Sequence, residues 1–413
     1  MREPLILDGN RTPLAIASEA PLSEFEISTP RRKLRILAVA VELVIAALGV
    51  AVMVLGVGAN RRWLDHHVLP SFLLSHDLLA TIETIVRVVL AAAGAVLVAA
   101  VRPAVGRVLR EAPGLALSTA VAMVLAIAAS EPLLRQIEFR PVGWLSADDE
   151  PRRQADARLG WTLVPSRAGH ASVGGRSVEY VTDASGLRVA TAGTSVDVSQ
   201  PTSLFVGESV MFGEGLTWEE SIPAQVGALT GIQSANLAVH GFGNDQAFLR
   251  LQAELPRFER PVAVISLFMP ALFGRNLDRE RPYLSAGLVW QPPVHQWRVQ
   301  SLLRLMVPYH RSATIEDGIA LTREIFAATA TLARSRGALP LLVVPQFGPE
   351  SEPEADLRRR VLTGLGVPSL LVQIDPGWRL PWDRHPDARA AHAIATAIAS
   401  RLGSEARFGP EAS

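Results

Sequence analysis

The chain has 413 residues, with 40 basic and 40 acidic side chains and a formal net charge of zero. A neutral chain has no overall charge with which to recruit nucleic acid or an acidic partner. Because the chain contains no cysteine, disulfides, thiolate metal sites and a cysteine nucleophile are excluded. Hydrophobic residues make up 49% of the chain, and its mean hydropathy of +0.24 is high for a soluble protein.

Three apolar runs lie in the first third of the chain, at about Ile36–Gly58, Leu79–Val101 and Leu115–Leu134. A helix needs roughly 20 apolar residues to cross the hydrocarbon core of a bilayer, so each run predicts a membrane-spanning helix. The first run is too long for a cleaved signal peptide and lies behind a polar tail. The sequence therefore predicts a cytoplasmic tail over residues 1–33 and a three-helix membrane anchor over residues 34–134.

Positively charged residues flank these runs unequally. Four closely precede the first run and three separate the second from the third, but only Arg61 and Arg62 separate the first from the second. The positive-inside rule then places the N-terminus and the second loop in the cytoplasm and everything after Leu134 outside. No other arrangement balances the loops better, although four arginines follow the third run on its outer side: Arg135, Arg140, Arg152 and Arg153.

Charged side chains also occur inside the predicted spans. Glu42 lies in the first run, and Glu83 and Arg87 lie four residues apart in the second. Side chains at this spacing share one helix face and can pair. Intramembrane charge is a hypothesis of function by default, but three short helices leave little room for a transport path. A helix-packing ion pair is therefore the favoured interpretation of Glu83 and Arg87.

The remainder of the chain changes pattern twice. Residues 135–200 are interpreted as a linker and a small strand-rich lead-in. Short apolar strands then alternate with helices, which predicts an α/β domain over residues 201–404 with a flavodoxin-like parallel sheet and a short tail over residues 405–413. Its site would lie at the carboxyl ends of the strands. The expected strands are Ser203–Val206, Ser234–Val239, Val262–Phe268, Leu339–Val344 and Ser369–Ile374.

Residues 275–312 fit this alternation poorly. They hold several tryptophans and prolines and an apolar helix expected from about Val299 to Met306. Three interpretations of this segment stay open: an insertion over the site, an insertion against the membrane, or an ordinary surface loop.

The candidate chemistry begins at Ser209, which follows the first of these strands on a turn that contains Gly207. A serine there can direct its hydroxyl into a cleft, but serine is a weak nucleophile and needs a base. Asp383 and His385 lie two residues apart just before the last predicted helix, so the carboxylate can fix the tautomer of the imidazole. The alternatives are a helix-capping serine and a surface histidine.

Three segments in this order resemble the blocks of the SGNH (GDSL-like) hydrolase family: Gly207-Glu208-Ser209, Asn236 through Gly241, and Asp383 through Pro386. The segments Leu159-Gly160-Trp161 and Gly186-Leu187-Arg188 are similar to the lead-in of bacterial envelope members. The resemblance covers about residues 156–402. It implies a triad of Ser209, His385 and Asp383, with the backbone N–H of Gly241 in the oxyanion hole.

The chain departs from the family pattern at three points. Glu208 replaces the usual aspartate, and one residue rather than two separates Asp383 from His385, as in the alginate O-acetyltransferase-like branch. Pro270 falls near the place where the third block has an oxyanion asparagine, and proline can donate no hydrogen bond. Asn244 and Asn276 are the candidate substitutes for that asparagine.

Together these features predict a multi-pass protein of the bacterial inner membrane, the bacterial source being inferred from a composition rich in Arg, Ala, Val and Leu. Its extracytoplasmic domain is expected to be a serine esterase that acts on O-acyl groups of envelope glycan or lipid. No cofactor, metal or nucleic-acid partner is expected; Asp65, His66, His67 and His76 are interpreted as a polar loop. Two alternatives stay open. One is an O-acyltransferase for an envelope polysaccharide, supplied by a membrane acyl-donor partner, and the other is a catalytically inactive glycan-binding or assembly module.

Overall fold

A computed structural model describes the chain over six ranges, and its residues divide into two compact units. The first unit comprises Met1–Leu55 and Leu90–Val124, and the second comprises Gly56–Val89 and Leu125–Ser413. Of the predicted terminal tails, residues 1–28 and 409–413 lie outside the described part. The described ranges are 29–60, 63, 65–72, 76–136, 149–301 and 309–408.

The three predicted apolar runs are helical. Among the described residues, three segments are long and apolar enough to cross a membrane: Arg32–Gly58, Ala80–Glu111 and Pro113–Gln136. The second is longer than its apolar run because the helix continues through Arg102, Arg107 and Arg110, where the sequence suggested a loop. The elements are α1 (Thr29–Gly58), α3 (His76–Val96), the π-helical turn η1 (Leu97–Val101), α4 (Arg102–Glu111) and α5 (Pro113–Gln136).

Glycines allow α1 to approach its neighbours closely within the first unit. A Cβ atom on Gly49 would lie 2.9 Å from the carbonyl oxygen of Gly94 in α3. Such small residues let helix backbones meet where lipid provides no hydrophobic drive. Glu42 of α1 accepts a hydrogen bond of 2.7 Å from Arg110 of α4, and a side chain on Gly106 would collide with its carboxylate. Glu42 is therefore held by an ion pair within the first unit.

An eight-stranded sheet forms the centre of the second unit, in the order β12-β11-β8-β6-β7-β5-β4-β3. The five strands from β12 to β7 are parallel, as the alternation predicted, and their order matches the doubly wound 2-1-3-4-5 pattern. Their bounds are β6 (Pro201–Val206), β7 (Gln233–Asn236), β8 (Arg260–Leu267), β11 (Leu339–Phe347) and β12 (Ser369–Ile374).

The lead-in extends this same sheet with three antiparallel strands, β3 (Ala168–Val173), β4 (Arg176–Thr182) and β5 (Arg188–Val189). The first part of residues 135–200, interpreted from the sequence as a linker, also contains strands. β1 (Arg153–Asp156) and β2 (Gly160–Leu163) form an antiparallel hairpin there. The hydrophobic period of such short strands is too brief to distinguish a hairpin from a linker.

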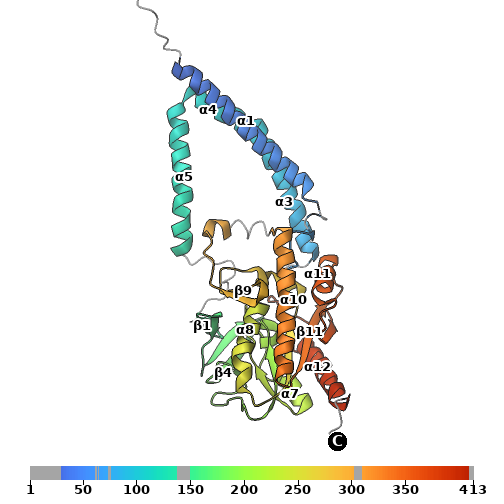
Figure 1. The fold of residues 1–413 in the computed structure, drawn as a ribbon. Coiled ribbons are helices and arrows are strands. Elements are labelled where there is room, and N and C mark those ends of the chain that lie inside the picture. The colour runs from blue at the N-terminus through green and yellow to red at the C-terminus, as the bar shows by residue number, and fades with distance from the viewer. Residues whose placement is uncertain are drawn as a thin grey trace, which may run out of the picture. The chain divides into compact units, whose positions relative to one another are not determined.

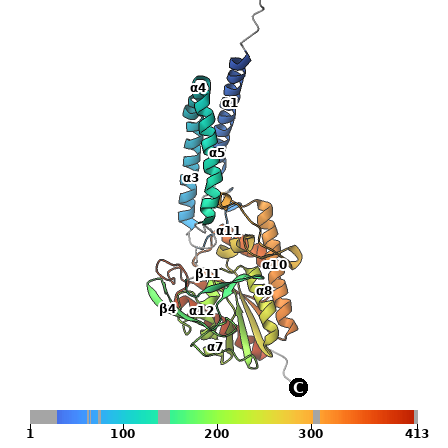
Figure 2. The ribbon, with the colours of Figure 1, turned by 90° about the vertical axis from the view of Figure 1, so that its left-hand side faces the viewer.

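Helices cover both faces of the sheet, as Figures 1 and 2 show. The side chain of Phe205 packs into a core shared with α7 (Ile222–Thr230) and α12 (Ala388–Phe408). Its neighbours Leu204 and Val206 face the other way, toward α8 (Asn244–Glu254) and α10 (Ser312–Ser335). This alternation of buried side chains along β6 is what a strand covered on both faces requires. A third core cluster joins α10 to α11 (Glu352–Leu362).

The segment that fitted the alternation poorly is largely irregular. The 3-10 turn η2 (Leu255–Arg257) lies before it, and the segment begins inside the 3-10 turn η3 (Pro270–Leu277). It contains a small hairpin of β9 (Tyr283–Ser285) and β10 (Val289–Gln291) around η4 (Ala286–Leu288). The helix predicted over Val299–Met306 falls mostly at residues 302–308, outside the described residues.

The loop between α1 and α3 belongs to the core of the second unit. Phe72 is buried in the main core cluster, and Leu69 packs with the cluster around Phe273 and Ile315. The carbonyl oxygen of His67 accepts a hydrogen bond of 2.8 Å from the backbone N–H of His310. A loop that the sequence presented as merely polar thus provides apolar contacts to the α/β domain.

Candidate active site

Ser209 begins a single helical turn, α6 (Ser209–Phe212), directly after β6. Glu208 caps this turn, because its side chain accepts a hydrogen bond of 3.1 Å from the N–H of Val210. Gly213 ends the turn with a φ of 87°, a left-handed conformation that glycine adopts without strain. Ser209 itself is buried. The nucleophile candidate is therefore fixed from both ends of a short, rigid turn.

Arg188 of β5 holds the far end of the same turn. Its guanidinium donates to the carbonyl oxygens of Phe212 at 2.7 Å, Gly213 at 2.9 Å and Leu216 at 2.6 Å. The group lies 4.8 Å from the ring centres of both Tyr180 and Phe212, so aromatic faces compensate part of its charge. Burial lowers the pKa of Arg188 to about 10. Its structural role was not predicted, although the Gly186-Leu187-Arg188 lead-in was the signal.

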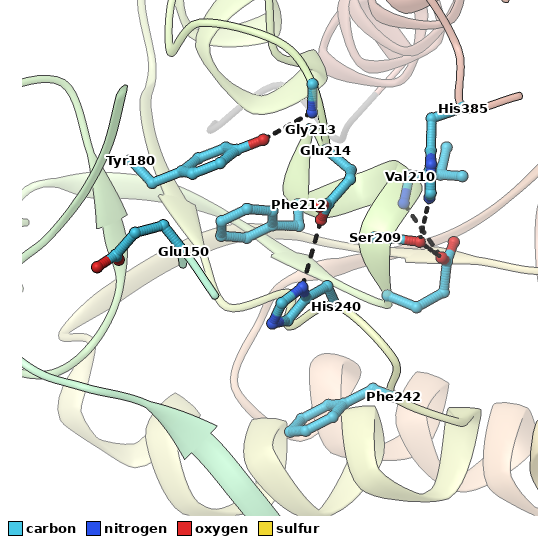
Figure 3. A network of polar contacts seen from close by, with 12 residues as sticks. Glu150, Tyr180, Ser209, Val210, Phe212, Gly213, Glu214, His240, Phe242 and His385 are labelled. Carbon is cyan, nitrogen blue, oxygen red and sulfur yellow. Dashed lines mark hydrogen bonds and ion pairs between the residues drawn. The ribbon is translucent and has the colours of Figure 1, made fainter. Parts of the chain in front are cut away.

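The three residues predicted as a triad lie together in hydrogen-bonding order. Nε2 of His385 is 2.8 Å from Oγ of Ser209, and Nδ1 of His385 is hydrogen-bonded to Oδ1 of Asp383. Figure 3 shows the imidazole of His385 directed at Ser209. The same carboxylate oxygen accepts a bond of 3.2 Å from the backbone N–H of His385. This geometry lets His385 take a proton from Ser209 while Asp383 orients the ring.

The loop that carries the base is strained. Trp382 and Arg384 have φ values of 65° and 69°, so two residues with side chains occupy left-handed conformations on either side of Asp383. Each such residue costs on the order of 1–3 kcal/mol and persists only where other contacts impose it. Here the N–H of Leu380 donates to the carbonyl oxygen of His385 at 2.7 Å, and Arg379 donates to that of Arg384 at 2.6 Å.

Neighbouring carboxylates favour the charged form of His385. Burial of the imidazole opposes protonation, but the hydrogen bond to Asp383 and the negative charge of Glu214 raise the pKa of His385 above its ordinary value. Burial likewise opposes ionisation of Asp383, and the hydrogen bond and charge of His385 outweigh it and lower the pKa of Asp383. The pair thus stabilises the imidazolium that forms when a base accepts a proton.

Glu208 offers a second acceptor to the nucleophile. Oγ of Ser209 lies 2.7 Å from Oε2 of Glu208. Nη1 of Arg275, in η3, approaches the same carboxylate oxygen at 3.4 Å and the carbonyl oxygen of Phe242 at 3.5 Å. The guanidinium therefore lies beside Glu208 and Phe242, which are the chain neighbours of Ser209 and Gly241. Sequence reasoning missed Arg275, because an isolated arginine outside a motif carries no signal.

The register of the sheet explains the position of Gly241. The N–H of Leu237 donates to the carbonyl of Phe205, and that of Val239 donates to the carbonyl of Gly207. In a parallel ladder the next donor would be the N–H of Gly241. At Ser209, however, the chain turns into α6, and the Gly241 N–H donates to none of the described residues. Gly241 has a φ of 81°. Among the described residues, the Gly241 N–H is thus the first donor of this series that has no carbonyl partner.

Asn244 and Asn276 contact each other rather than Ser209. The side-chain amide of Asn276 donates to Oδ1 of Asn244 at 2.9 Å and to Oγ1 of Thr322 at 2.9 Å. Oδ1 of Asn276 accepts the N–H of Asn244 at 2.8 Å. Both amide hydrogens of Asn276 are therefore used within the protein, while the Asn244 amide donates to the carbonyl of Leu267 at 3.1 Å. The pair fixes η3, which begins at Pro270 and carries Arg275.

A second buried pair lies on the other side of the nucleophile turn. Nδ1 of His240 is 3.4 Å from Oε2 of Glu214, and both side chains are almost fully buried. Burial opposes ionisation of Glu214, but His240 and then His385 lower its pKa, so the carboxylate stays charged. Figure 3 places this pair beside Phe212, away from the Ser209 hydroxyl. Within the described residues, no group of three or more His, Asp and Glu side chains is arranged to hold a metal.

The comparisons with known proteins give distant structural neighbours only. No family model and no curated protein match the chain. Among solved structures, an acetyl xylan esterase from Butyrivibrio proteoclasticus is 12% identical, with 52% of this chain and 67% of that chain covered and a TM-score of 0.33. A structure described as a lipolytic protein of the G-D-S-L family from Desulfitobacterium hafniense DCB-2 is 15% identical, with coverages of 49% and 98% and a TM-score of 0.33. A family two carbohydrate esterase from Clostridium thermocellum is 10% identical, with coverages of 53% and 68% and a TM-score of 0.34.

Proposed function

We propose that this protein is a membrane-anchored serine esterase of SGNH type that cleaves O-acyl esters of envelope glycan or lipid. The observation that carries the proposal is the continuous hydrogen-bond chain from Ser209 through His385 to Asp383. A merely capping serine and a merely superficial histidine have no reason to meet at 2.8 Å across 176 residues of chain. The same alignment argues against the inactive binding module.

In the proposed mechanism, Oγ of Ser209 attacks the ester carbonyl carbon while Nε2 of His385 takes the hydroxyl proton. The backbone N–H groups of Ser209 and Gly241 donate to the oxyanion that forms. The intermediate collapses, the carbon–oxygen bond to the alcohol breaks, and His385 returns the proton to the leaving alcohol. Water, deprotonated by His385, then hydrolyses the acyl-enzyme and regenerates Ser209.

In this proposal Asn276 supports the structure of the site and does not donate to the oxyanion, since its amide hydrogens already have protein acceptors. Asn244 has the same structural role, because its backbone N–H is bonded to Oδ1 of Asn276 and its side-chain amide is bonded to the carbonyl of Leu267. With Pro270 unable to donate, the guanidinium of Arg275, which lies 3.4 Å from Oε2 of Glu208, is the candidate for a third oxyanion donor. Asparagine donors of this kind typically contribute about 10²–10³ in rate.

The proposed location is the bacterial inner membrane, with the catalytic domain on the extracytoplasmic face. Two observations support it. The loop before α3 packs into the core of the α/β domain, which requires both to be on the same side of the membrane. Two candidate spans, Ala80–Glu111 and Pro113–Gln136, separate them in sequence and return the chain to that side. The distribution of positive charge then indicates the outer face.

Transfer of the acyl group to a sugar hydroxyl is the second candidate function. The single residue between Asp383 and His385 favours it, because that spacing resembles the O-acetyltransferase-like branch. The alcohol of a polysaccharide would replace water in the second half of the mechanism. A membrane partner would then deliver the acyl group.

Turnover of p-nitrophenyl acetate by the full chain in detergent micelles tests the esterase proposal. We expect Ser209→Ala and His385→Ala each to lower kcat/KM by about 10³-fold or more. Ser335→Ala, an exposed serine at the end of α10, is the matched control and should leave turnover unchanged. Turnover that survives Ser209→Ala in a pure preparation would contradict the mechanism. Acyl transfer to added oligosaccharide, dependent on Ser209, would identify the second function.

A further inference from the structure

The loop between α1 and α3 reaches the proposed active site itself. The ring of Phe72 lies 5.1 Å from the imidazole of His385, and the guanidinium of Arg379 lies 5.6 Å from the Phe72 ring. Phe72 is 8% exposed and belongs to the main core of the domain. The catalytic base candidate is therefore in direct contact with the segment that leads into a candidate membrane span.

The chain after Phe72 limits how far the site can be from the bilayer. α3 begins at His76, and its candidate span begins at Ala80. Four fully extended residues reach roughly 14 Å, and four helical residues rise about 6 Å. With the Phe72 side chain and the 5.1 Å ring contact added, the imidazole of His385 lies on the order of 30 Å or less from the start of the span.

A second segment, which follows η3, is bonded to the end of another candidate span. Glu131, near the end of α5, accepts a hydrogen bond of 3.1 Å from the backbone N–H of Val299. Arg298 beside it forms an ion pair of 2.7 Å with Glu280, which also accepts a 2.7 Å bond from Ser301. Glu131 is only 8% exposed. The irregular segment after η3 is thus tied to the same end of the membrane anchor.

Exposed tryptophans occur on the loop that carries His385 and on the irregular segment after η3. Trp382, next to Asp383, is 100% exposed and has a left-handed backbone, and Trp297 is 67% exposed. An indole that is fully exposed to water lacks the favourable free energy that burial of its apolar surface usually provides. Tryptophan is enriched at the headgroup level of membranes, where one part of the ring is apolar and another is wet. Both side chains are therefore suited to a membrane interface.

We infer that the active site works at the surface of its own membrane and takes its ester from a lipid-anchored molecule, either an acyl lipid or a lipid-linked glycan. The inference rests on the proposed function and adds the substrate class. A site held so close to a span by Phe72 and Glu131 meets membrane-borne esters at high local concentration. Polymers beyond the reach of the anchored site are excluded as its main substrate.

Two vesicle populations test the inference. The full chain is reconstituted into phosphatidylcholine vesicles that carry a 4-methylumbelliferyl acetate group on a dialkyl lipid. In a second sample, the labelled lipid is placed in separate vesicles without protein. We expect turnover at least about tenfold faster when enzyme and ester share a membrane. Equal rates in the two samples would overturn the inference.

The soluble ester 4-methylumbelliferyl acetate separates this inference from the proposed function. Turnover of the soluble ester that depends on Ser209, together with equal turnover of lipid-borne ester in both vesicle arrangements, would overturn the inference alone. No Ser209-dependent turnover of any ester would contradict the proposed function instead.

Because the chain has no cysteine, single labels measure the position of the domain independently of activity. Trp297→Cys and Ser335→Cys are labelled with an environment-sensitive fluorophore in vesicles that contain bromolipids. Ser335 lies at the far end of α10, roughly 34 Å along the helix from Ser312, and serves as the matched control. We expect the label at 297 to be quenched and the label at 335 to be unaffected. Equal quenching at both positions, or none at 297, would overturn the inference.

Discussion

The turn that carries Ser209 and the loop that carries His385 are held in different ways. The turn is buried, capped by Glu208 at its start and bonded to Arg188 at its end. The loop is partly exposed and contains left-handed conformations at Trp382 and Arg384. The position of Ser209 thus depends on the core of the domain, whereas the position of His385 depends on a few contacts at its surface.

This difference indicates that the loop is the less firmly held part of the candidate site. Phe72 packs against the imidazole of His385, and Arg379 lies 4.0 Å from the ring of Phe347 while it holds the carbonyl of Arg384. The position of His385 therefore depends partly on the loop between α1 and α3. Loss of the contacts that hold the turn should destabilise the domain, whereas loss of the contacts that hold the loop should lower its activity without unfolding it.

The largest expected effect follows from Asp383→Asn, which keeps the shape of the loop but removes the charge beside His385. We expect kcat to fall by about 10³–10⁴-fold, because an amide favours the wrong imidazole tautomer. The melting temperature should change little. Steady-state kinetics on a soluble ester and a thermal melt check the two parts, and a kcat within tenfold of the parent would refute the role given to Asp383.

Arg188→Met tests whether Arg188 holds the turn that carries Ser209. Three buried carbonyl oxygens would lose their donor, and we expect the free energy of unfolding to fall by about 3–5 kcal/mol. The exposed Arg389 provides the matched control, since Arg389→Met should change stability by less than about 0.5 kcal/mol. Denaturant titration of both variants measures the difference, and equal stabilities would show that Arg188 does not hold the turn.

Phe72→Ala should lower kcat by roughly 10–100-fold, because a base displaced by about 1 Å loses much of its effect. Phe72→Leu, which keeps apolar contact with His385, should retain activity within a few-fold. Kinetics of the two variants in the same detergent provide the measurement. An alanine variant as active as the leucine variant would show that the anchor loop does not position the base.

The smallest effect concerns pH. His385 must be neutral to accept a proton, so activity falls as pH drops through its pKa. Glu214 is among the charges that raise this pKa, and Glu214→Gln should therefore move the acidic limb of kcat/KM to lower pH. A pH profile of the variant checks the direction. An unmoved limb, or a limb at higher pH, would contradict the electrostatic role of Glu214.

The sequence predicted the parts of the molecule that local patterns encode. Apolar runs of membrane length are helical, and the alternation of apolar strands and helices produced the parallel sheet. Ser209, Asp383 and His385 were found because each follows or precedes a recognisable element. The roles of these three residues remain predictions until activity is measured.

What the sequence did not predict depends on contacts between distant segments. Nothing in the residues around Phe72 indicates that it meets His385 more than 300 residues away. Arg275 is an isolated arginine that becomes informative only beside Glu208. The lead-in strands were expected, but their addition to the main sheet through Arg188 and Asn236 is a pairing that hydrophobic period cannot specify.

The central claim is that Ser209 is an activated nucleophile, and covalent labelling tests it most directly. The full chain is required, because a truncation after the third span would remove Phe72 and Leu69 from the core. In detergent, a fluorophosphonate probe should label the parent protein with loss of fluoride, and Ser209→Ala and His385→Ala should remain unlabelled. A folded parent that does not react, or a Ser209→Ala variant that does, would contradict the account.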